Sequence, residues 1–370
     1  SMYLFIGQFL LIIKILCLNW ILKNKTIILT GGGTAGHIMP NIALLSELKK
    51  HFSRICYVGT NGMEKDIAKQ HGLEFFEISA IKLIRKLTLK NCLIPFKLIK
   101  SINQCKKIIK EIKPDVIFSK GGYVSVPLAI AGKKYNIPVI SHESDLSIGL
   151  ANKIIAKYAV AVCTSFFETS QKNKKFIYTG SPIREQIFKG NKNLVMQKYN
   201  LDKHKPTILF LGGSLGSKAI NNCVVDNLSA LCKKFNILHI AGKTMTPEIK
   251  NNYVRFDFVS DIENLYACSD VVVCRSGANT IFELLALTKP MILIPLPKTE
   301  SRGDQIENAE NFEKNKYAEI IYQENLNINT LINKIENCLK NKEKIIFNQQ
   351  KANLKNANKN IIEIILKYSK

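Results

Sequence analysis

A glycine-rich loop near the start of the chain has the residue types of a phosphate site. Residues 26–40 read TIILTGGGTAGHIMP, which is a β-branched apolar run, a glycine cluster and the start of a predicted helix. Such a loop commonly binds a phosphate, because the first N–H groups of the helix and its dipole both favour an anion. Residues 31–36 also satisfy G-x-G-x-x-G, so a dinucleotide cofactor is the first hypothesis.

The residues around this loop argue against both common nucleotide motifs. A dinucleotide site needs an acidic residue at the end of the second strand, but that strand ends in Gly-Thr-Asn at 59–61. The nearest acid, Glu64, is expected in the following helix. A P-loop is excluded because His37 and Ile38 stand where Lys and Ser or Thr should follow the last glycine. The loop therefore predicts a phosphate site of another kind.

The elements that position this loop follow from the pattern of the chain after residue 25. Near-continuous apolar runs alternate with helix-length segments, which is typical of parallel sheets covered on both faces. Six runs precede residue 180 and six follow it, which predicts two Rossmann-like α/β domains with parallel sheets, facing each other across a cleft. The predicted strands are residues 26–30, 54–60, 115–122, 138–143, 159–165, 175–180, 207–213, 235–242, 254–259, 270–277, 290–297 and 317–323.

The second half of the chain begins as the first does. Residues 207–221, TILFLGGSLGSKAIN, repeat the strand, the glycine loop and the helix start. The stretch TGSPIR (179–184) is a candidate hinge, since Gly and Pro are typical of turns. We therefore expect an N-terminal domain over 25–181 and a C-terminal domain over 182–348. Residues 349–370 are expected to form a C-terminal helix, with the N-terminal domain as its candidate packing partner.

Residues 1–24 form an apolar extension ahead of the first domain. The stretch YLFIGQFLLIIKILCLNWIL (3–22) carries Lys14 as its only charge and is long enough to just span a bilayer. It is followed by no small-residue cleavage site, which argues against a secretory signal. Three interpretations stay open: a membrane anchor, an interfacial helix, or an upstream extension from a misplaced start codon.

Composition limits the remaining possibilities. The 370 residues, 46% of them hydrophobic, suffice for two domains. The formal net charge of +24 has two open explanations: a biased composition rich in Lys, Asn and Ile, or an anionic partner such as a membrane surface or nucleic acid. Ten cysteines without a C-x-x-C pair predict reduced thiols in a cytosolic protein. No D-x-D and no cluster of metal-ligand spacing occurs, so we expect no metal.

Seven further clusters of glycine and polar residues fall at the ends of predicted strands. They are KGGYVSVP (120–127), SHESD (141–145), GLANK (149–153), GSPIR (180–184), LGGSLGSK (211–218), CRSGANTIFE (274–283) and SRGDQIENA (301–309). Together with GGGTAGHIMP, and in the same order, these motifs resemble the MurG family, the N-acetylglucosaminyltransferases of bacterial peptidoglycan synthesis. The resemblance covers residues 25 to about 365 and excludes residues 1–24.

The resemblance implies a GT-B fold and an inverting hexosyltransferase that needs neither metal nor cofactor. N-acetylglucosamine would pass from UDP-N-acetylglucosamine (UDP-GlcNAc), bound by the C-terminal domain, to lipid I, bound by the N-terminal domain. Lipid I is undecaprenyl-pyrophosphoryl-MurNAc-pentapeptide, and the product is lipid II, which serves cell-wall biogenesis, cell shape and cell division. Two alternatives stay open: another UDP-sugar enzyme of this fold (a transferase to a different lipid, or a UDP-GlcNAc 2-epimerase), and a membrane-surface UDP-sugar binder without turnover.

The resemblance also implies which residues bind the donor. Glu283 matches the family glutamate that accepts hydrogen bonds from both ribose hydroxyls of UDP. Arg184 matches a hinge arginine near the donor, Gln305 a contact of the donor sugar, and Val259 backbone contacts with the uracil. The other donor-side positions are Gly213, Ser214, Gly216, Ser276, Gly277, Ala278, Thr280 and Asp304.

On the acceptor side the base is the open question. An inverting transfer needs a group that takes the proton from the acceptor 4-hydroxyl, and a histidine, with an ordinary pKa of roughly 6.5, suits that task near neutrality. His37 and Glu143 are the two candidates. The acceptor-side binding positions are Thr34, Ala35, Gly36 and Tyr123.

Two further polar residues are expected near the substrates. Asp145 stands where some relatives carry Asn, and a carboxylate near a diphosphate weakens binding unless it faces a hydroxyl or an amide. Asn152 could supply an amide close to it. We expect both to bind substrate.

The basic excess is concentrated in one segment. Residues 81–113 contain ten Lys or Arg against one acid, Glu111, interleaved with apolar side chains. This mixture suits an anionic lipid surface, and the family resemblance implies docking on the cytoplasmic face of the cell membrane as a peripheral protein. The alternative is a core helix with a solvated lysine face. Nucleic acid is not an expected partner, because the segment has no aromatic platform or recognition motif.

Overall fold

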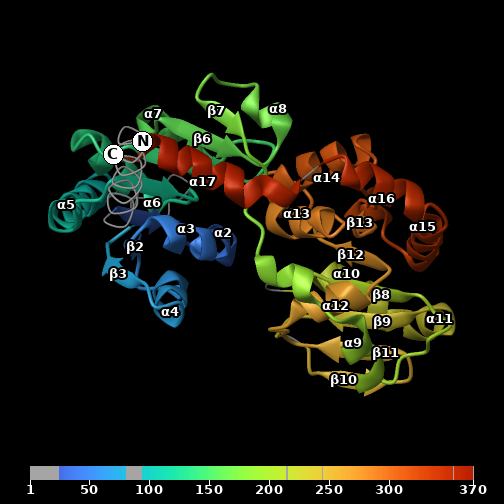
Figure 1. Cartoon of the computed structure of the whole chain (residues 1–370). Coiled ribbons are helices and arrows are strands. Elements are labelled where there is room, and N and C mark those ends of the chain that lie inside the picture. Colours follow the sequence, from blue (N-terminus) through green and yellow to red (C-terminus); the bar gives the residue numbers. More distant parts are fainter. Residues whose placement is uncertain (1–24, 81–93, 214–215, 244, 353, 370) are drawn as a thin grey trace, which may run out of the picture. The chain divides into compact units, whose positions relative to one another are not determined.

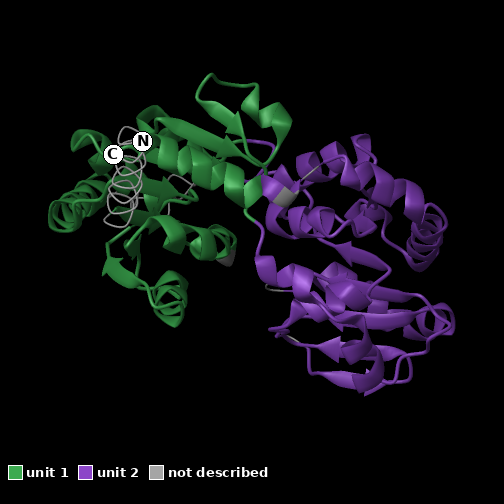
Figure 2. Ribbon diagram, in the orientation of Figure 1, with its two compact units in different colours: residues 1–143, 148–182, 357–370 green, residues 144–147, 183–356 purple. Residues whose placement is uncertain are grey.

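Two β-sheets organise the chain, one in each of two compact units (Figures 1 and 2). The computed structural model describes residues 25–80, 94–213, 216–243, 245–352 and 354–369. Unit 1 takes the described residues of 1–143, 148–182 and 357–370, and unit 2 takes those of 144–147 and 183–356. The expectations for residues 1–24, for the first part of the basic segment and for Ser214 fall outside the described residues.

Unit 1 is built on a sheet of parallel strands. The strands are β1 (Thr26–Thr30), β2 (Arg54–Gly59), β3 (Glu74–Glu77), β4 (Val116–Ser119), β5 (Val139–Glu143), β6 (Ala161–Thr164) and β7 (Phe176–Tyr178). Within the described residues their order is β3-β2-β1-β4-β5-β6-β7, and every neighbouring pair is parallel. The carboxyl ends of β1, β4 and β5 therefore lie side by side at one edge, which is where ligands bind in sheets of this kind.

Helices cover both faces of this sheet, which explains why its central strands are apolar throughout. The helices are α2 (Ala35–Ala43), α3 (Leu45–His51), α4 (Met63–Gln70), α5 (Ile94–Ile112), α6 (Ser125–Lys134), α7 (Leu150–Tyr158), α8 (Phe167–Ser170) and α17 (Ala357–Tyr368). Ile28 of β1 points into a core shared with α5, α6 and α7. Its neighbours Ile27 and Leu29 point into the opposite core, because side chains alternate along a strand.

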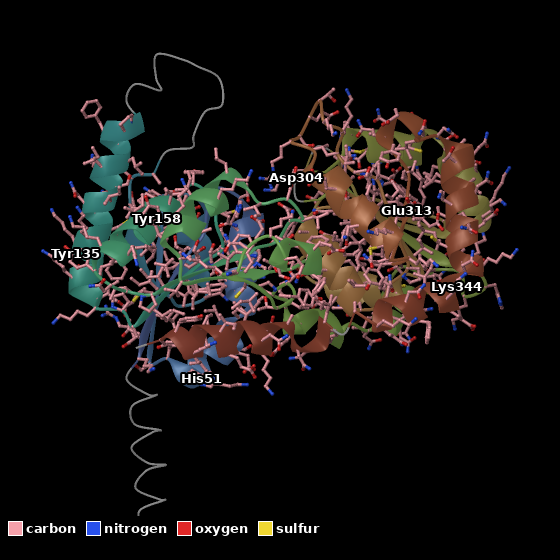
Figure 3. The ribbon with its side chains drawn as sticks, turned by 90° about the horizontal axis from the view of Figure 1, so that it is seen from above. His51, Tyr135, Tyr158, Asp304, Glu313 and Lys344 are labelled. Atoms are coloured by element: carbon pink, nitrogen blue, oxygen red, sulfur yellow. The ribbon has the colours of Figure 1, made fainter. Side chains whose placement is uncertain are left out.

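The C-terminal helix α17 belongs to the core of unit 1. Ile361, Ile362 and Ile365 are buried in the same cluster as Leu44 and Leu48. Helix α17 packs beside α3, the helix that ends at the labelled residue His51 in Figure 3. A segment from the far end of the chain thus closes one face of the N-terminal sheet.

Unit 2 repeats the plan with one antiparallel edge. Its strands are β8 (Thr207–Leu211), β9 (Asn236–Ile240), β10 (Glu248–Lys250), β11 (Tyr253–Phe256), β12 (Val271–Cys274), β13 (Met291–Leu293) and β14 (Glu319–Ile320). Among the described residues their order is β10-β11-β9-β8-β12-β13-β14, with β10 and β11 antiparallel and the other pairs parallel. The helices are η2 (Glu185–Lys189), α9 (Lys192–Lys198), α10 (Lys218–Asp226), α11 (Leu228–Lys234), α12 (Ile262–Cys268), α13 (Ala278–Ala286), α14 (Asp304–Lys314), η3 (Gln323–Asn325), α15 (Ile328–Lys340), α16 (Lys342–Gln350) and η4 (Leu354–Asn356).

The predicted fold class is confirmed: each unit is an α/β layer structure, and every predicted strand is present in the described part of the chain. Strands β3 and β10 were not predicted. Both lie at sheet edges and read EFFE and EIK, with charged residues at their ends and half-buried or exposed side chains. Edge strands of this kind lack the apolar run by which buried strands are recognised.

No helix in the described residues is both long and apolar enough to cross a bilayer.

Candidate active site

In unit 1 the loops after β1 and β4 pack tightly against each other. A Cβ on Gly122 would lie 2.6 Å from the carbonyl oxygen of Gly32, and a Cβ on Gly33 would lie 2.5 Å from the ring of Tyr123. Gly33 and Gly122 also have positive φ values of 87° and 79°. Only glycine fits such positions without strain. The two loops therefore place backbone N–H groups at the same sheet edge, as binding of an anion requires.

His37 lies directly after this loop, in the first turn of α2, which Ala35 and Gly36 begin. Its Nδ1 is 2.8 Å from the hydroxyl oxygen of Thr34. When Nδ1 carries the hydrogen and donates to Thr34, the lone pair that can accept a proton is on Nε2. Thr34 is exposed and His37 is half-buried. The structure thus gives His37 a hydrogen-bonded partner at Nδ1.

Glu143, the rival base, is held inside unit 1. Its side chain closes β5 and is 4% exposed. Oε2 accepts hydrogen bonds from the backbone N–H of Gly149 at 3.0 Å and from Asn152 Nδ2 at 2.9 Å. Asn152 in turn accepts from the hydroxyl of Ser141 at 2.9 Å. These bonds tie the carboxylate of Glu143 to the start of α7.

A buried lysine at this edge was not predicted. Lys120 follows β4, is 2% exposed, and places Nζ 2.7 Å from Nδ1 of His142. His142 Nε2 is 2.9 Å from the carbonyl oxygen of Gly180. Burial, and then the charge of Lys120, lower the pKa of His142 well below its usual value. The neutral imidazole therefore donates to Gly180 and accepts from Lys120. The motif KGGYVSVP contained this lysine, but lysines are seldom buried, so its burial carried no signal in the sequence.

In unit 2 an arginine and a glutamate far apart in sequence form a two-pronged ion pair. Arg184 Nε is 2.7 Å from Glu283 Oε1, and Nη2 is 3.0 Å from Oε2. Glu283 lies in the second turn of α13, and its residue is 9% exposed. Burial, and then the charge of Glu283, raise the pKa of the Tyr266 phenol well above its usual value. Two predicted donor residues, Arg184 and Glu283, are thus brought together.

The first turn of α14 is hydrogen-bonded to the residue that precedes the N-cap of α13 and to the loop after β13. The hydroxyl of Ser276 donates to the carbonyl oxygen of Gln305 at 2.7 Å, and Gln305 Oε1 accepts from the backbone N–H of Leu296 at 3.2 Å. Gly277 and Ala278 begin α13 beside Ser276. Figure 3 labels Asp304 and Glu313, which lie in the first and last turns of α14. The donor positions Ser276, Gln305 and Asp304 therefore belong to one connected region.

Asp145 also belongs to unit 2, although the motif SHESD grouped it with Glu143. Its carboxylate accepts from Arg302 Nη2 at 2.8 Å and from Asn308 Nδ2 at 3.0 Å. Asp304 Oδ2 is 3.4 Å from Arg302 Nε. Asp145 thus faces the guanidinium of Arg302, which offsets its negative charge, and the amide of Asn308, which donates a hydrogen bond to it. Arg302 and Asn308 were not predicted, although both occur in the motif SRGDQIENA.

Arg275 is a second positioning group that the sequence did not reveal. Its Nη1 donates to the carbonyl oxygens of Ile294 and Pro295 at 3.0 and 3.2 Å, and its Nη2 donates to Gln323 Oε1 at 2.5 Å. Burial lowers the pKa of Arg275 from its usual value. The guanidinium fixes the start of the loop that leads from β13 to Gln305.

The remaining donor positions lie in loops and in one helical turn. A Cβ on Gly216 would lie 2.3 Å from the carbonyl oxygen of Ala241, so the loop after β8 approaches the loop after β9 closely. Gly213 has a positive φ of 86°, and among the described residues beyond its chain neighbours no atom lies within 4 Å of the place that a Cβ would take. Thr280 is half-buried in α13, and Val259 is half-buried after β11 and takes no part in the hydrogen bonds above. In the part of the chain that the structure describes, no group of three His, Cys, Asp or Glu side chains could hold a metal ion.

Two family descriptions match the chain. The glycosyltransferase family 28 N-terminal domain matches residues 27–164, and the glycosyltransferase family 28 C-terminal domain matches residues 207–365. The first match covers the two glycine loops of unit 1 and His37. The second covers α13, α14 and Glu283, and it extends into α17.

Solved structures with the same fold span nearly the whole chain. MurG of Acinetobacter baumannii superposes with a TM-score of 0.70 at 24% identity, over 93% of this chain and 100% of that protein. UDP-GlcNAc 2-epimerase from Neisseria meningitidis, bound to UDP-GlcNAc, gives a TM-score of 0.64 at 14% identity, over 93% and 100% of the two chains. At these identities the likeness shows the fold, which is the GT-B fold expected from the motifs.

Sequence relatives carry the comparison further. The UDP-N-acetylglucosamine--N-acetylmuramyl-(pentapeptide) pyrophosphoryl-undecaprenol N-acetylglucosamine transferase of Clostridium tetani is 46% identical over 352 residues, which are 93% of this chain and 98% of that protein. The transferase of the same name from Clostridium botulinum (strain Loch Maree / Type A3) is 47% identical over 353 residues, 94% and 100% of the two chains. Identity at this level over more than nine-tenths of each chain confirms the resemblance that the motifs indicated. The chain therefore belongs to glycosyltransferase family 28 and, within it, to the MurG family of N-acetylglucosamine transferases.

Proposed function

We propose that the chain transfers N-acetylglucosamine from UDP-GlcNAc to the 4-hydroxyl of the MurNAc residue of lipid I, forming lipid II. The observation that carries this proposal is the 46–47% identity, over 93–94% of the chain, to relatives named for that transfer. The hydrogen-bonded arrangement of the predicted residues in each unit supports it.

The donor is assigned to unit 2. Glu283, held by Arg184, has the chemistry to accept hydrogen bonds from the ribose hydroxyls of UDP. The N-terminus of α13, at Gly277 and Ala278, supplies backbone N–H groups and a favourable dipole for the diphosphate. Gln305, tied to Ser276, lies beside this helix start and is assigned to the sugar.

The acceptor is assigned to unit 1. The loops at 31–34 and 121–123 receive the diphosphate of lipid I. Nε2 of His37, in the tautomer that carries its hydrogen on Nδ1, takes the proton of the 4-hydroxyl. The hydroxyl oxygen then forms a bond to the anomeric carbon of the sugar while the bond from that carbon to the UDP oxygen breaks. The charge that develops on the departing diphosphate is stabilised by the donor-side helix start.

We further assign the exposed face of α5 to the membrane surface, at the cytoplasmic face, with the protein held as a peripheral enzyme. Phe96 and Ile99 are 72% and 56% exposed, and they share one side of the helix with Lys100 and Lys107. Figure 3 shows α5 with its side chains and, close to its C-terminal half, Tyr135, whose ring lies 5.9 Å from Lys110 Nζ. Exposed apolar tips among cations suit insertion between anionic headgroups.

The test is the release of UDP from UDP-GlcNAc, measured with and without a short-chain lipid I analogue, and with EDTA present. We expect release that depends on the acceptor and that survives EDTA. Release without acceptor would point to hydrolysis or to the epimerase reaction. Binding of UDP-GlcNAc with no turnover under any acceptor would contradict the transferase and indicate a UDP-sugar binder.

A further inference from the structure

We propose that Arg184 is a positioning residue that acts through Glu283: it orients the glutamate carboxylate and thereby gives the donor site its selectivity for ribose over deoxyribose. The inference rests on the proposed function, because it concerns the same UDP site. It differs from a direct contact of Arg184 with the donor, because the arginine acts here through the carboxylate of Glu283.

The geometry of the pair is that of a fork on a carboxylate. Both oxygens of Glu283 are engaged, by Nε at 2.7 Å and by Nη2 at 3.0 Å. Two parallel hydrogen bonds of this kind fix the plane of the carboxylate as well as its position. Burial alone would lower the pKa of Arg184, but the hydrogen bonds and the charge of Glu283 outweigh it and raise the pKa. The arginine is therefore a permanent cation beside Glu283.

The surroundings of Glu283 make this support necessary. Glu283 is on the buried side of α13, between Phe282 and Leu284, which are both buried. The phenol of Tyr266, 1% exposed, lies next to the same carboxylate and also next to Arg184. A carboxylate with so little contact with water is costly unless it is paired. Without the arginine it would turn toward solvent, and it would then no longer accept hydrogen bonds from a ligand in a fixed direction.

The two hydrogen bonds from Arg184 leave part of the hydrogen-bond acceptor capacity of Glu283 for a ligand. An ionised carboxylate has about four lone-pair directions, and Arg184 uses one on each oxygen. The phenol of Tyr266 also meets this carboxylate, and hydrogen-bond acceptor capacity still remains for a hydroxyl donor of a ribose. Because a vicinal diol meets this carboxylate only at a defined angle, the orientation set by Arg184 decides how well it binds. Removing the 2′-hydroxyl should therefore matter only while Arg184 holds Glu283.

The experiment compares the binding of UDP and of 2′-deoxy-UDP to the full chain by titration calorimetry. The variants are Arg184→Met, Arg184→Lys, Glu283→Gln and the double variant with Arg184→Met and Glu283→Gln. The matched control is Arg255→Met, which breaks another arginine–glutamate pair of unit 2, with Glu248 at 3.0 Å on the β10–β11 edge. Circular dichroism monitors folding.

We expect the natural chain to prefer UDP by about tenfold, the effect of one hydrogen bond to a charged acceptor. In Arg184→Met the ratio of the Kd for 2′-deoxy-UDP to the Kd for UDP should fall to nearly one. Arg184→Lys, which keeps the charge but not the two parallel hydrogen bonds, should retain part of the preference for UDP. The double variant should show the same ratio as Glu283→Gln alone, since both residues act through one carboxylate. Arg255→Met should keep the full preference.

Three results would overturn the inference. If Arg184→Met weakens UDP and 2′-deoxy-UDP by the same factor, the arginine acts on the phosphates and not through Glu283. If the natural chain binds UDP without preferring it, Glu283 does not select ribose. If it binds no UDP at all, the proposed function fails together with the inference. Should Arg184→Met not fold, Arg184→Lys serves as the test, and an unchanged preference in that variant counts against the inference.

Discussion

At the scale of single residues, Glu283 is the side chain on which donor binding depends most. Replacing Glu283 by Ala removes the acceptor for the ribose hydroxyls, and it should weaken UDP binding by about 2 kcal/mol, or roughly thirtyfold. Calorimetry with UDP measures the change. The control is Glu336→Ala, which removes an exposed glutamate of unit 2 that pairs with Lys234. Unchanged affinity in Glu283→Ala would remove the ribose assignment.

His37 should affect chemistry and not donor binding. Because a positioned general base contributes roughly 10²–10⁴-fold, His37→Gln should lower kcat by that range while the affinity for UDP stays the same. Thr34→Val, which removes the partner of Nδ1, should cause a smaller loss. Steady-state rates with a lipid I analogue check both, with His71→Gln at the end of α4 as the control. A kcat that His37→Gln leaves intact would return the base role to Glu143 or to another group.

The sequence predicted individual site residues better than their partners. Glu283 could be placed one to two turns into a helix from its motif alone, and it lies there in α13. Its partner Arg184 is 99 residues away, and their pairing depends on how η2 and α13 pack, which no local pattern encodes. Asp145 shows the same limit, because two residues after Glu143 the chain has passed into the other unit.

At the scale of elements, α17 should stabilise unit 1. Ile361 is fully buried in the core that includes Leu44 and Leu48, so Ile361→Ala should cost about 2–5 kcal/mol in the free energy of unfolding. Glu363→Ala, an exposed change on the same helix, should be nearly neutral. Urea unfolding measures the cost. In Ile361→Ala, hydrogen exchange should become faster, relative to the unaltered chain, in β1 and β4 and not in β8 and β12. Faster exchange in β8 and β12 instead would contradict the packing of α17 in unit 1.

Helix α5 should bind membranes through its exposed face. The double variant Phe96→Gln and Ile99→Gln removes the apolar tips and keeps every lysine, so binding to anionic vesicles should weaken severalfold while UDP binding stays unchanged. Sedimentation with vesicles containing anionic lipid measures it. Phe347→Gln, which removes an exposed aromatic side chain from α16 of unit 2, is the control. Equal binding by the double variant and the control would contradict docking through α5.

Buried strands could be predicted from the sequence, whereas exposed edge strands could not. Buried strands such as β1 and β12 have uninterrupted apolar runs, and the sequence placed them to within a residue or a few. The edge strands β3 and β10 have no such run, and they form only because β2 and β11 offer unpaired backbone groups beside them. Local pattern identifies a strand that a core requires, whereas an edge strand depends on its neighbour.

At the scale of the whole molecule, buried thiols should make the fold sensitive to alkali. Burial raises the pKa of each of four thiols from its usual value near 9 to about 12; they belong to Cys105, Cys163, Cys274 and Cys338. The unfolded chain therefore loses these protons first, so their contribution to stability is complete below pH 9 and is lost as pH rises toward 12. Each thiol lowers the free energy of unfolding by about 1.4 kcal/mol per pH unit in that range.

One lysine acts in the opposite direction. Burial lowers the pKa of Lys289 from 10.5 to about 8, so the folded chain binds fewer protons between those values, and this group alone makes stability rise with pH. Four thiols outweigh one amine, so urea unfolding should show a steep net loss of stability above pH 9. The loss should be shallower in Cys274→Ala. A free energy of unfolding that stays constant from pH 8 to 10.5 would contradict the expected opposing contributions of Lys289 and the four thiols.

The place of α17 has a consequence for the order in which the protein is completed during synthesis. The ribosome makes the strands of unit 1 first and the whole of residues 183–356 before it makes residues 357–369. Until then, one face of the earliest sheet lacks the helix that supplies Ile361, Ile362 and Ile365. Domains usually fold in the order in which they emerge. Here the earlier unit waits, with part of its apolar surface uncovered, for a helix that is translated after all of its neighbour.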